Sequence, residues 1–505
     1  MSTSPNQAST EPGPVIERAA PVAVVGAGTM GAGIAQVAAV AGHPVIVYDA
    51  AEGAAARAVA AGRDRVAGLV QKGRLEGPVD LRLEVAGELG ELARAGCVIE
   101  AVAEDLAVKQ ALFAGLEKVV TPDCVLATNT SSLSPTAIAA GLSHPGRLVG
   151  LHFFNPAPVM RLVEVVSGLA TDPAVAAAVT RLAQDWGKQV VQASATPGFI
   201  VNRVARPFYA EALRLAEERA ASPATIDAVL TQAGGFRMGP FALMDLVGQD
   251  VNEAVTRSVW TAFGYDPRFA PSLLQRAMVE AGWLGRKTGR GWFHYGDDAE
   301  PSEPDAAPPR SAPSWITEHG ESPLRILLGR SGVEIRAGER RDGTVELPGG
   351  ALLVRCDGRP ATALGRPAVV VDRTLDDATA TGIAIAASDG VPADAAAEAT
   401  GLLQAAGLTV YVVDDAPGLV VTRTVAMLVN GAVDARQKGV ASAADIDTAM
   451  RLGTNYPLGP LAWGDRWGPA TIVGILDAMQ AWYGEDRYRP SALLRRIAAA
   501  GGSLT

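Results

Sequence analysis

The feature that most constrains this chain is a glycine-rich turn between a short apolar run and an alanine-rich stretch near the N-terminus. Residues 22–25 read VAVV, and GAGTMG follows them directly over residues 26–31. The spacing G-x-G-x-x-G in this setting predicts a strand, a tight turn and then a helix. Gly26 suits the turn, Gly28 lets the backbone approach a ligand closely, and Gly31 lets the helix pack against the strand.

The start of that helix is suited to binding phosphate. Unpaired N–H groups and the positive end of the helix dipole attract anions there, and Gly42 is placed to end the helix. A second apolar run, VIVY over residues 45–48, ends in Asp49, about twenty residues after the glycines. A carboxylate at this position accepts hydrogen bonds from a ribose 2′-OH and repels a 2′-phosphate. The sequence therefore predicts a dinucleotide site that prefers NAD to NADP.

Two further buried strands are predicted over residues 97–102 and 124–128, each flanked by helical stretches. This alternation is typical of a parallel sheet in an α/β domain. Glu104 follows the first strand, and the sequence NTSS follows the second over residues 129–132. Open α/β sheets bind ligands at the carboxyl ends of their strands, so these side chains are candidates for a site.

A histidine and a glutamate flank a predicted turn farther along the chain. Residues 147–166 read RLVGLHFFNPAPVMRLVEVV, with His152 on the first β-type run and Glu164 on the second. Antiparallel pairing across the turn would bring the two side chains within hydrogen-bond reach, as a proton-abstracting base requires. A histidine beside two phenylalanines is also typical of a core residue, so both interpretations remain open on spacing alone.

At this point the chain resembles a known family, the NAD-dependent 3-hydroxyacyl-CoA dehydrogenases. The resemblance covers roughly residues 20–296, and its motifs occur in the family's order and spacing. They are the glycine loop with its GIAQ continuation, ED at 104–105, NTSS at 129–132, HFFNP at 152–156, PGFIVNR at 197–203 and GRKTGRGWF at 285–293. The family's longer members, including those of aromatic-acid (phenylacetate) catabolism, are similar in carrying a second helical domain.

The resemblance implies a role for each matched residue. His152 is then the general base that takes the 3-hydroxyl proton while hydride leaves C3, and Glu164 orients it. Ser131 and Asn202 hydrogen-bond the substrate oxygens. The cofactor-binding residues implied are Gly26, Gly28, Thr29, Met30, Gly31, Asp49, Glu104, Lys109, Asn129, Ser131 and Asn155. Lys109 is placed near the junction with the acyl-CoA, and so is also a substrate-binding candidate.

The chain departs from the family's pattern in the predicted helix over residues 50–73. Family members carry a hydroxyl and a lysine there that contact CoA, whereas this helix is rich in alanine and glycine. Arg63 and Lys72 are candidates for contact with the CoA phosphates. The departure keeps an alternative open, namely a dehydrogenase of a free hydroxy acid. A nucleotide-binding relative that has lost catalysis is a third interpretation.

The second half of the chain repeats part of the first. Residues 197–282 match 417–501 at an offset of 220, falling to 219, but Thr422 stands where the first copy has Asn202. No HFFNP and no glycine loop precede the second copy, so we expect it to be non-catalytic. Predicted domains are then a disordered tail (1–18), a Rossmann-like NAD-binding domain (19–195), a helical substrate and dimerisation domain (196–296), a linker (297–322), a reduced α/β domain without the phosphate loop (323–416) and a second helical domain (417–505). The predicted fold class is thus α/β plus all-α.

Composition narrows the class of protein further. Lys plus Arg number 44 against 54 Asp plus Glu, and this net charge of −10 argues against a chain-wide nucleic-acid surface. Three cysteines are too few for a disulfide framework or a Cys-rich zinc site, so no metal is predicted and a cytoplasmic location is expected. The uncharged stretch over residues 21–42 contains five glycines, and we expect no membrane span.

The expected partner is therefore an acyl-CoA substrate, with neither nucleic acid nor membrane. The two helical copies suggest either a homo-oligomer or a pseudo-dimer within one chain. The acidic charge and the shared layout favour a short or dicarboxylic acyl group, with 3-hydroxyadipyl-CoA and 3-hydroxybutyryl-CoA as candidate substrates.

Overall fold

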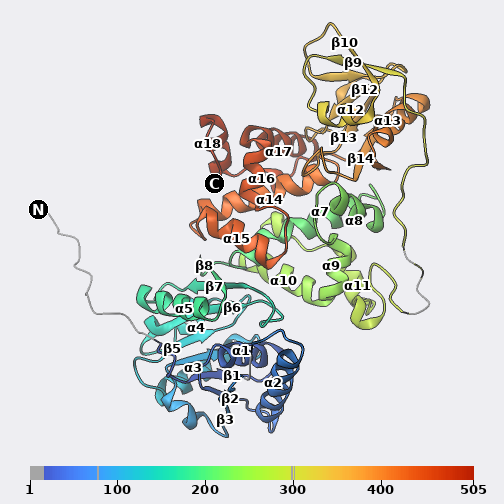
Figure 1. Cartoon of the computed structure of the whole chain (residues 1–505). Helices are drawn as coiled ribbons and strands as arrows, with labels where there is room; N and C mark the ends of the chain where they lie inside the picture. The colour runs from blue at the N-terminus through green and yellow to red at the C-terminus, as the bar shows by residue number, and fades with distance from the viewer. Residues whose placement is uncertain (1–15, 77–78, 297–299, 301) are drawn as a thin grey trace, which may run out of the picture. The chain divides into compact units, whose positions relative to one another are not determined.

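The computed structural model describes residues 16–76, 79–296, 300 and 302–505 (Figure 1). The chain forms two compact units. The first contains the residues up to Ile200 together with Gly439–Gly453, and the second contains Val201–Lys438 and Thr454–Thr505. The predicted tail over 1–18 falls largely on residues 1–15, which lie outside the described residues. The other predicted domain limits stay predictions.

The first unit is built on a sheet with the strand order β3-β2-β1-β4-β5-β6-β7-β8. Neighbouring strands run parallel, apart from the antiparallel pair of β6 and β7. The strands are β1 (Val22–Val25), β2 (Val45–Tyr48), β3 (Leu83–Val85), β4 (Cys97–Glu100), β5 (Val125–Thr128), β6 (Leu148–Phe153), β7 (Leu162–Ser167) and β8 (Gln189–Ser194).

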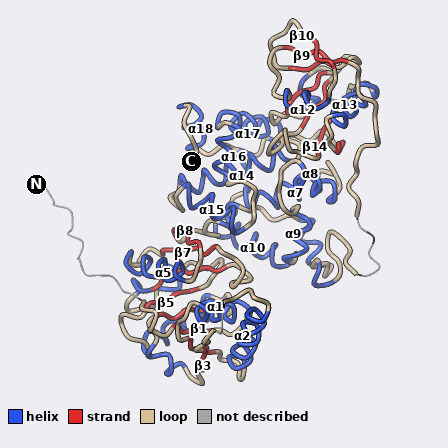
Figure 2. The backbone as a smooth tube through the Cα atoms, in the orientation of Figure 1, coloured by secondary structure: helices blue, strands red, loops and turns tan. Residues whose placement is uncertain are grey.

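Helices cover both faces of this sheet (Figure 2). Side chains alternate along each strand, so Val22 and Val24 face one apolar cluster while Ala23 and Val25 face the other. The first cluster includes α1 (Thr29–Val40), α2 (Ala54–Gln71) and α5 (Pro173–Asp185), and the second includes α3 (Leu106–Val119) and α4 (Pro135–Ala139). Strands buried on both faces explain the continuous apolar runs in the sequence.

The second unit combines helices with a smaller sheet. Its helices are α6 (Val201–Val204), α7 (Arg206–Glu217), α8 (Pro223–Gln232), α9 (Pro240–Val247), α10 (Gln249–Ala262), α11 (Leu273–Glu280), α12 (Arg325–Ser331), α13 (Ala393–Ala405), α14 (Val421–Gln437), α16 (Pro460–Trp467), α17 (Pro469–Tyr483) and α18 (Ala492–Ala500). The remaining helix, α15 (Ala443–Gly453), belongs to the first unit.

The smaller sheet has the order β10-β9-β11-β12-β13-β14-β15. Its strands are β9 (Trp315–His319), β10 (Glu334–Ala337), β11 (Thr344–Glu346), β12 (Leu352–Arg355), β13 (Ala368–Val371), β14 (Gly382–Ala387) and β15 (Thr409–Val412). This confirms the predicted fold class, with a Rossmann-like domain, helical regions and a reduced α/β domain. Within the predicted linker over 297–322, β9 pairs with β10 and β11 in this sheet.

The internal repeat extends farther back than the sequence indicates. In the first unit Leu151 lies opposite Val165 across β6 and β7, and in the second Val371 lies opposite Ile385 across β13 and β14. Both pairs differ by the same offset of 220 residues. These strands share their register and burial but little of their sequence, which explains why sequence matching begins only at residue 197.

In each unit a helix from one copy of the internal repeat packs on the sheet that precedes the other copy. In the first unit α15 packs on β7 and β8, and Ser194 N donates to Val440 O at 2.8 Å. In the second unit α8 packs on β14, and Asp414 N donates to Ala220 O at 2.8 Å. A helix of each copy therefore covers the sheet of the other.

None of the helices in the described parts of the chain is both long enough and apolar enough to cross a membrane.

We expect a chain truncated after Tyr295 to associate with itself. In the intact chain α14 packs on α7, α15 packs on β7 and β8, and the buried Arg203 binds Asp434 at 2.7 Å. Truncation exposes the apolar surfaces and leaves Arg203 without that carboxylate. Light scattering should show a dimer or aggregates, with the full chain as control. A stable, active monomer of residues 1–295 would show that the first copy does not need the second copy to cover its apolar surfaces, and would contradict this prediction.

Candidate active site

The glycine loop has the geometry that a dinucleotide requires. Gly26 adopts φ +100°, and a Cβ there would lie 2.5 Å from Ala101 O; a Cβ on Gly31 would lie 1.8 Å from Gly26 O. Both positions therefore exclude a side chain. At Gly28 no atom lies within 4 Å of an added Cβ, so this residue faces open space. Gly28 is also the N-cap of α1, and no side chain caps this helix. The first backbone N–H groups of α1 can therefore bind a ligand.

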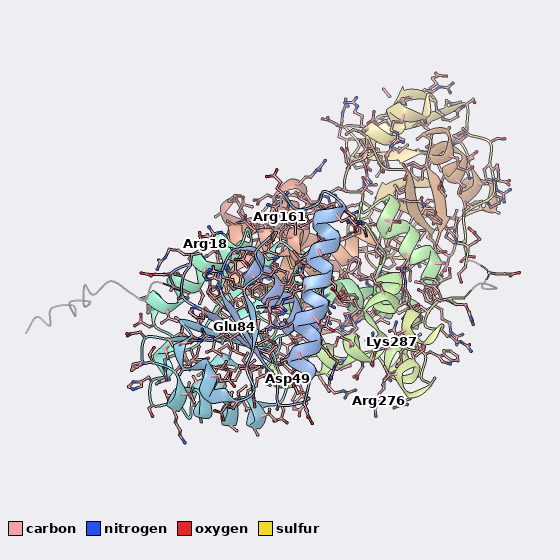
Figure 3. The ribbon with its side chains drawn as sticks, turned by 60° about the horizontal axis from the view of Figure 1, so that its bottom comes forward. Arg18, Asp49, Glu84, Arg161, Arg276 and Lys287 are labelled. Carbon is pink, nitrogen blue, oxygen red and sulfur yellow. The ribbon has the colours of Figure 1, made fainter. Side chains whose placement is uncertain are left out.

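Asp49 stands at the end of β2, beside this loop, and Figure 3 labels its side chain near one end of α2. Its Oδ2 accepts a hydrogen bond from Ala27 N at 2.6 Å, and its Oδ1 accepts one from Ala51 N at 2.8 Å. The carboxylate thus fixes the glycine loop to β2. This is the place at which the fold binds an adenosine ribose.

His152 and Glu164 form a buried pair at the antiparallel step of the sheet. The two residues are directly opposite in the register of β6 and β7, and His152 Nδ1 lies 2.6 Å from Glu164 Oε2. Glu164 Oε1 accepts a second hydrogen bond from Ile200 N at 3.1 Å. An ionised carboxylate only accepts, so Nδ1 carries the proton and Nε2 keeps its lone pair. The predicted pairing across the turn is confirmed.

Aromatic rings fix the imidazole from other sides. The ring centroid of Phe154 lies 4.5 Å from that of His152, and the Phe199 ring makes an edge contact at 5.9 Å. Only 5 % of His152 is exposed. The imidazole is therefore held in one orientation, as general-base chemistry requires.

Glu104 organises the loop that carries Ser131. Its Oε1 accepts hydrogen bonds from Thr130 Oγ1 at 2.6 Å, Ser131 N at 2.9 Å and Ser132 N at 3.0 Å. Burial raises the pKa of Glu104, but these hydrogen bonds and the charge of Lys109 outweigh it and hold the pKa below its ordinary value. The carboxylate is therefore ionised at neutral pH and acts as the anchor of the loop.

Lys109 lies beneath Glu104 with only 1 % of its side chain exposed. Its Nζ is 2.6 Å from Glu100 Oε1 and 3.3 Å from Glu104 Oε2. Glu100 in turn accepts from Thr128 Oγ1 at 2.7 Å. The structure places the Lys109 ammonium between Glu100 and Glu104. The direct ligand contact that the resemblance implies for Lys109 stays a prediction.

Glu100 was missed by the sequence reasoning, which considered only Glu104 on this loop. A fully buried carboxylate needs a partner, and Lys109 and Thr128 supply it. The signal was present, because Glu100 is the last residue of an otherwise apolar strand and lies at its carboxyl end.

The remaining predicted site residues are distributed as follows. Asn129 Oδ1 accepts from Phe153 N at 2.8 Å, so this side chain ties β5 to the strand of His152. Asn155 is exposed just after β6, and Ser131 is half-buried in the Glu104 loop. Asn202 lies in α6 of the second unit. Ser131 is not the cap of α4, because Ser134 caps that helix by accepting from Ala137 N.

Arg63 and Lys72, the two candidates for contact with the CoA phosphates, differ in whether their side chains are already bound. Arg63 Nη2 donates to Leu83 O at 2.8 Å, so this guanidinium is already bound to β3. Lys72 is exposed at the C-terminal end of α2. Of these two candidates, Lys72 is the better placed to meet a phosphate.

The second copy has other residues at the positions that correspond to His152 and Glu164. Adding 220 to His152 and Glu164 gives Asp372 and Ala384, and Asp372 N donates to Ala384 O at 2.9 Å. Asp372 is fully buried, and its Oδ1 accepts from Thr422 Oγ1 at 2.7 Å. At these two described positions the second copy therefore has neither an imidazole nor a glutamate. That this copy is non-catalytic stays a prediction.

A glycine loop beside an aspartate at the end of β2, in the same sheet as a buried His–Glu pair, is typical of a dinucleotide-dependent oxidoreductase. Comparison with known families agrees. The NAD-binding domain of 3-hydroxyacyl-CoA dehydrogenase matches residues 21–196, and the C-terminal domain of that enzyme matches 198–295 and again 418–503. The reduced Rossmann-fold domain of 3-hydroxybutyryl-CoA dehydrogenase matches residues 353–417.

Individual relatives are similar over nearly the whole chain or over its first half. A 3-hydroxyadipyl-CoA dehydrogenase of Escherichia coli (strain K12) is 47 % identical over 94 % of this chain and 97 % of its own length. A crystal structure of 3-hydroxybutyryl-CoA dehydrogenase from E. coli K12 has a TM-score of 0.88 at 46 % identity, covering 96 % of this chain and 99 % of that one. The crystal structure of (S)-3-hydroxybutyryl-CoA dehydrogenase PaaH1 from Ralstonia eutropha covers 55 % of this chain and 99 % of its own, with a TM-score of 0.53 and 39 % identity.

The chain belongs to the 3-hydroxyacyl-CoA dehydrogenase family, as its motifs predicted. It is an NAD-dependent oxidoreductase with the longer, two-copy layout of that family.

We expect Glu104→Gln to destabilise the first unit by about 1–2 kcal/mol near pH 7, because it removes the charge that pairs with Lys109. The value is kept low because the Glu104 side chain is 36 % exposed and water screens the ion pair. A carboxylate with a lowered pKa contributes stability above its ordinary pKa of about 4.3 and loses it as pH falls through the lower folded pKa. The difference from wild type should therefore shrink in acid. Urea unfolding near pH 7 and near pH 3 measures it.

Glu84→Gln is the matched control for this experiment. Glu84 (labelled in Figure 3) also pairs with a cation, but its side chain is 52 % exposed and that of Arg94 is 57 % exposed. An exposed pair of this kind contributes little, so we expect a change within about 0.5 kcal/mol. Equal losses for Glu104→Gln at both pH values would contradict the role given to the charge.

Proposed function

We propose that this dehydrogenase oxidises 3-hydroxyadipyl-CoA, or a similar dicarboxylic (S)-3-hydroxyacyl-CoA, to the 3-oxoacyl-CoA, with His152 as the base. The observation that carries the chemical part of this proposal is the 2.6 Å contact between His152 Nδ1 and Glu164 Oε2 in a buried setting. The pair leaves Nε2 as the basic atom, in a sheet that also bears the glycine loop.

His152 takes the proton of the 3-hydroxyl at Nε2 as the C3–H bond breaks. Removal of that proton lets electrons move from the oxygen into the forming carbonyl, so the hydride leaves C3 readily. Glu164 keeps the imidazole in the required tautomer and stabilises the positive charge that it gains. In the reverse direction the same nitrogen returns the proton.

The residues present fit NAD. Gly28 offers a cradle that a Cβ would fill, and the start of α1 offers N–H groups from Thr29 to Gly31 for the pyrophosphate. Asp49 would hold the adenosine ribose, and Glu104, with Lys109 beneath it, would line the nicotinamide end. When bound, NAD supplies the acceptor for the hydride.

Ser131 and Asn202 are proposed to hydrogen-bond the substrate oxygens, as the family resemblance implies. For Ser131 the support is its place on the loop that Glu104 fixes through Ser131 N at 2.9 Å. For Asn202 the support is its position in the PGFIVNR motif, in which Thr422 replaces it in the second copy.

The acyl group is proposed by similarity to the E. coli 3-hydroxyadipyl-CoA dehydrogenase, which matches this chain over nearly its whole length. The related crystal structure of an E. coli 3-hydroxybutyryl-CoA dehydrogenase makes 3-hydroxybutyryl-CoA the second candidate. We place the enzyme in the cytoplasm, where its three free, buried cysteines suit a reducing environment.

The base assignment predicts that His152→Gln lowers kcat by about 10²- to 10⁴-fold, because the amide cannot accept the proton. NAD affinity should change by less than about twofold, since the glycine loop and Asp49 are untouched. Absorbance of NADH measures turnover, and calorimetric titration measures NAD binding. His144→Gln is the control, because His144 is exposed and its hydrogen bonds to Glu117 and Arg147 are made by its backbone. Retained turnover in His152→Gln would refute the base.

The substrate assignment predicts that kcat/KM is highest for 3-oxoadipyl-CoA in a series with acetoacetyl-CoA and longer 3-oxoacyl-CoAs. Free 3-hydroxybutyrate and L-gulonate should be turned over poorly, because they lack the CoA that binds away from the reacting carbon. A preference for either free acid would favour the hydroxy-acid alternative.

A further inference from the structure

A turn over residues 154–161 joins β6 to β7 next to the His152–Glu164 pair. Only one further residue pair of the two strands lies between His152–Glu164 and this β6–β7 turn. The Phe154 ring, whose centroid lies 4.5 Å from that of the imidazole, belongs to the turn itself. A displacement of the β6–β7 turn is therefore transmitted directly to the imidazole.

Lys188 binds the β6–β7 turn through two backbone carbonyls. It stands immediately before β8, and its Nζ donates to Ala157 O at 2.6 Å and to Met160 O at 2.8 Å. The residue is only 9 % exposed, and burial lowers the pKa of its side chain. Among the described residues no carboxylate forms an ion pair with this ammonium. A buried ammonium is unfavourable unless its N–H groups find acceptors, so the two carbonyls of the turn are what stabilises it.

Two other contacts fix the same turn. A Cβ added to Gly33 on α1 would lie 3.2 Å from both Ala157 Cβ and Pro158 Cδ, so the turn approaches this helix as closely as a glycine allows. At the end of the turn, Gln189 N donates to Arg161 O at 2.8 Å. The β6–β7 turn is thus held by α1 and by the start of β8, both of which lie outside the hairpin.

The second copy holds its corresponding turn in the same way with a different residue. At the offset of 220, Asp377 and Ala380 correspond to the two residues whose carbonyls Lys188 binds. Arg330, on α12, donates from Nη1 to Asp377 O at 2.6 Å and from Nη2 to Ala380 O at 3.1 Å. The counterpart of Lys188 itself is Leu408, which is buried. A cation therefore binds the same two carbonyls in both copies, although it comes from a different position in the chain.

The two cations differ in what their turns adjoin. In the second copy Asp372 and Ala384 stand where the first copy has His152 and Glu164. The turn that Arg330 binds has no imidazole beside it at this position, whereas the β6–β7 turn does. The second copy thus offers the same backbone contact without the proposed base, which allows the two roles to be separated by experiment.

We propose that Lys188 is a positioning residue for the reaction, because it fixes the β6–β7 turn and, through that turn, the orientation of His152 toward Glu164. This inference rests on the proposed function, in which His152 is the base. The lysine supplies two donors that keep the turn in place, so β6 and β7 hold their register up to the last residue pair. A loosened turn would let the imidazole tilt away from the glutamate, and proton abstraction at Nε2 would slow.

Lys188→Met tests this inference, because methionine keeps the apolar stem and loses the ammonium. The variant should fold, since the second copy has the buried Leu408 at this position. With saturating NADH and acetoacetyl-CoA, kcat per folded enzyme should fall by about tenfold to a hundredfold, the loss typical of a catalytic group displaced by about 1 Å. KM for acetoacetyl-CoA should change by less than about threefold, because Ser131 lies on a different loop. Absorbance of NADH measures both values.

Proton NMR supplies a measurement that a loss of stability alone would not change. The His152 Nδ1 proton, identified by its absence in His152→Gln, lies in the 2.6 Å contact with Glu164. In folded Lys188→Met its exchange with water should be about tenfold faster, because the freed turn lets the pair separate more often. Lys188→Arg should recover most of kcat and slow the exchange again. Arg330 shows that a guanidinium makes both hydrogen bonds, and a cavity of about 230 Å³ beside Lys188 has room for it.

Arg330→Met is the matched control. It removes the same two hydrogen bonds from the second copy, where position 372 has no imidazole. We expect it to lower the free energy of unfolding, while kcat and the exchange of the His152 Nδ1 proton stay within about twofold of wild type. A Lys188→Met enzyme that keeps wild-type kcat and exchange would overturn the inference, and so would an equal loss of kcat in Arg330→Met.

Gly33→Ala tests the same turn if Lys188→Met does not fold. The added Cβ displaces the β6–β7 turn by a few tenths of an ångström and leaves Lys188 in place. A fall in kcat of about threefold, with faster exchange of the Nδ1 proton, supports the inference, whereas unchanged kcat and exchange overturn it. These failures differ from failure of the proposed function, which would appear as retained turnover in His152→Gln.

Discussion

The hydrogen bond between His152 and Glu164 is the interaction on which the account of this enzyme depends. It exists because the sheet changes from parallel to antiparallel at β6 and β7, which places the two residues directly opposite each other. Glu164 can be fully buried because His152 and Ile200 N occupy its two oxygens. A slip of one residue in register would turn every side chain of β7 to the opposite face and separate the pair. The antiparallel step therefore determines the geometry of the proposed base.

Buried charge also organises the loop that carries Ser131 in the first unit. Glu100, Lys109 and Glu104 form a chain of ionic contacts from the sheet interior to the Ser131 loop. The second copy shows what the fold retains when the chemistry is absent. There Asp372 accepts hydrogen bonds from Val420 N and Val421 N at the start of α14, and Ala384 stands in place of the glutamate. The helical packing and strand register persist, which indicates that these serve stability in both halves.

The fold of the first unit and most of its candidate site could be predicted from the sequence, because each signal lies within a short stretch of chain. The glycine loop, Asp49 and the His152–Glu164 spacing each combine a few residues with one strand or turn. Three features could not be predicted in this way. The contact of Lys109 with Glu104 depends on how deeply the lysine side chain is buried. The strand β9 lies in a segment rich in proline and acidic residues, and α15 packs with the first unit although 248 residues lie between β8 and α15. Each depends on contacts made between distant parts of the chain.

The tautomer of His152 tests the central claim most directly. The chain has five histidines, so ¹⁵N NMR of enzyme labelled at histidine, compared with His152→Gln, identifies the His152 signals. The account predicts a protonated Nδ1, bound to Glu164, and an unprotonated Nε2. A proton on Nε2 with a bare Nδ1 would contradict it, because that imidazole could neither donate to the carboxylate nor accept from the substrate hydroxyl at the proposed atom.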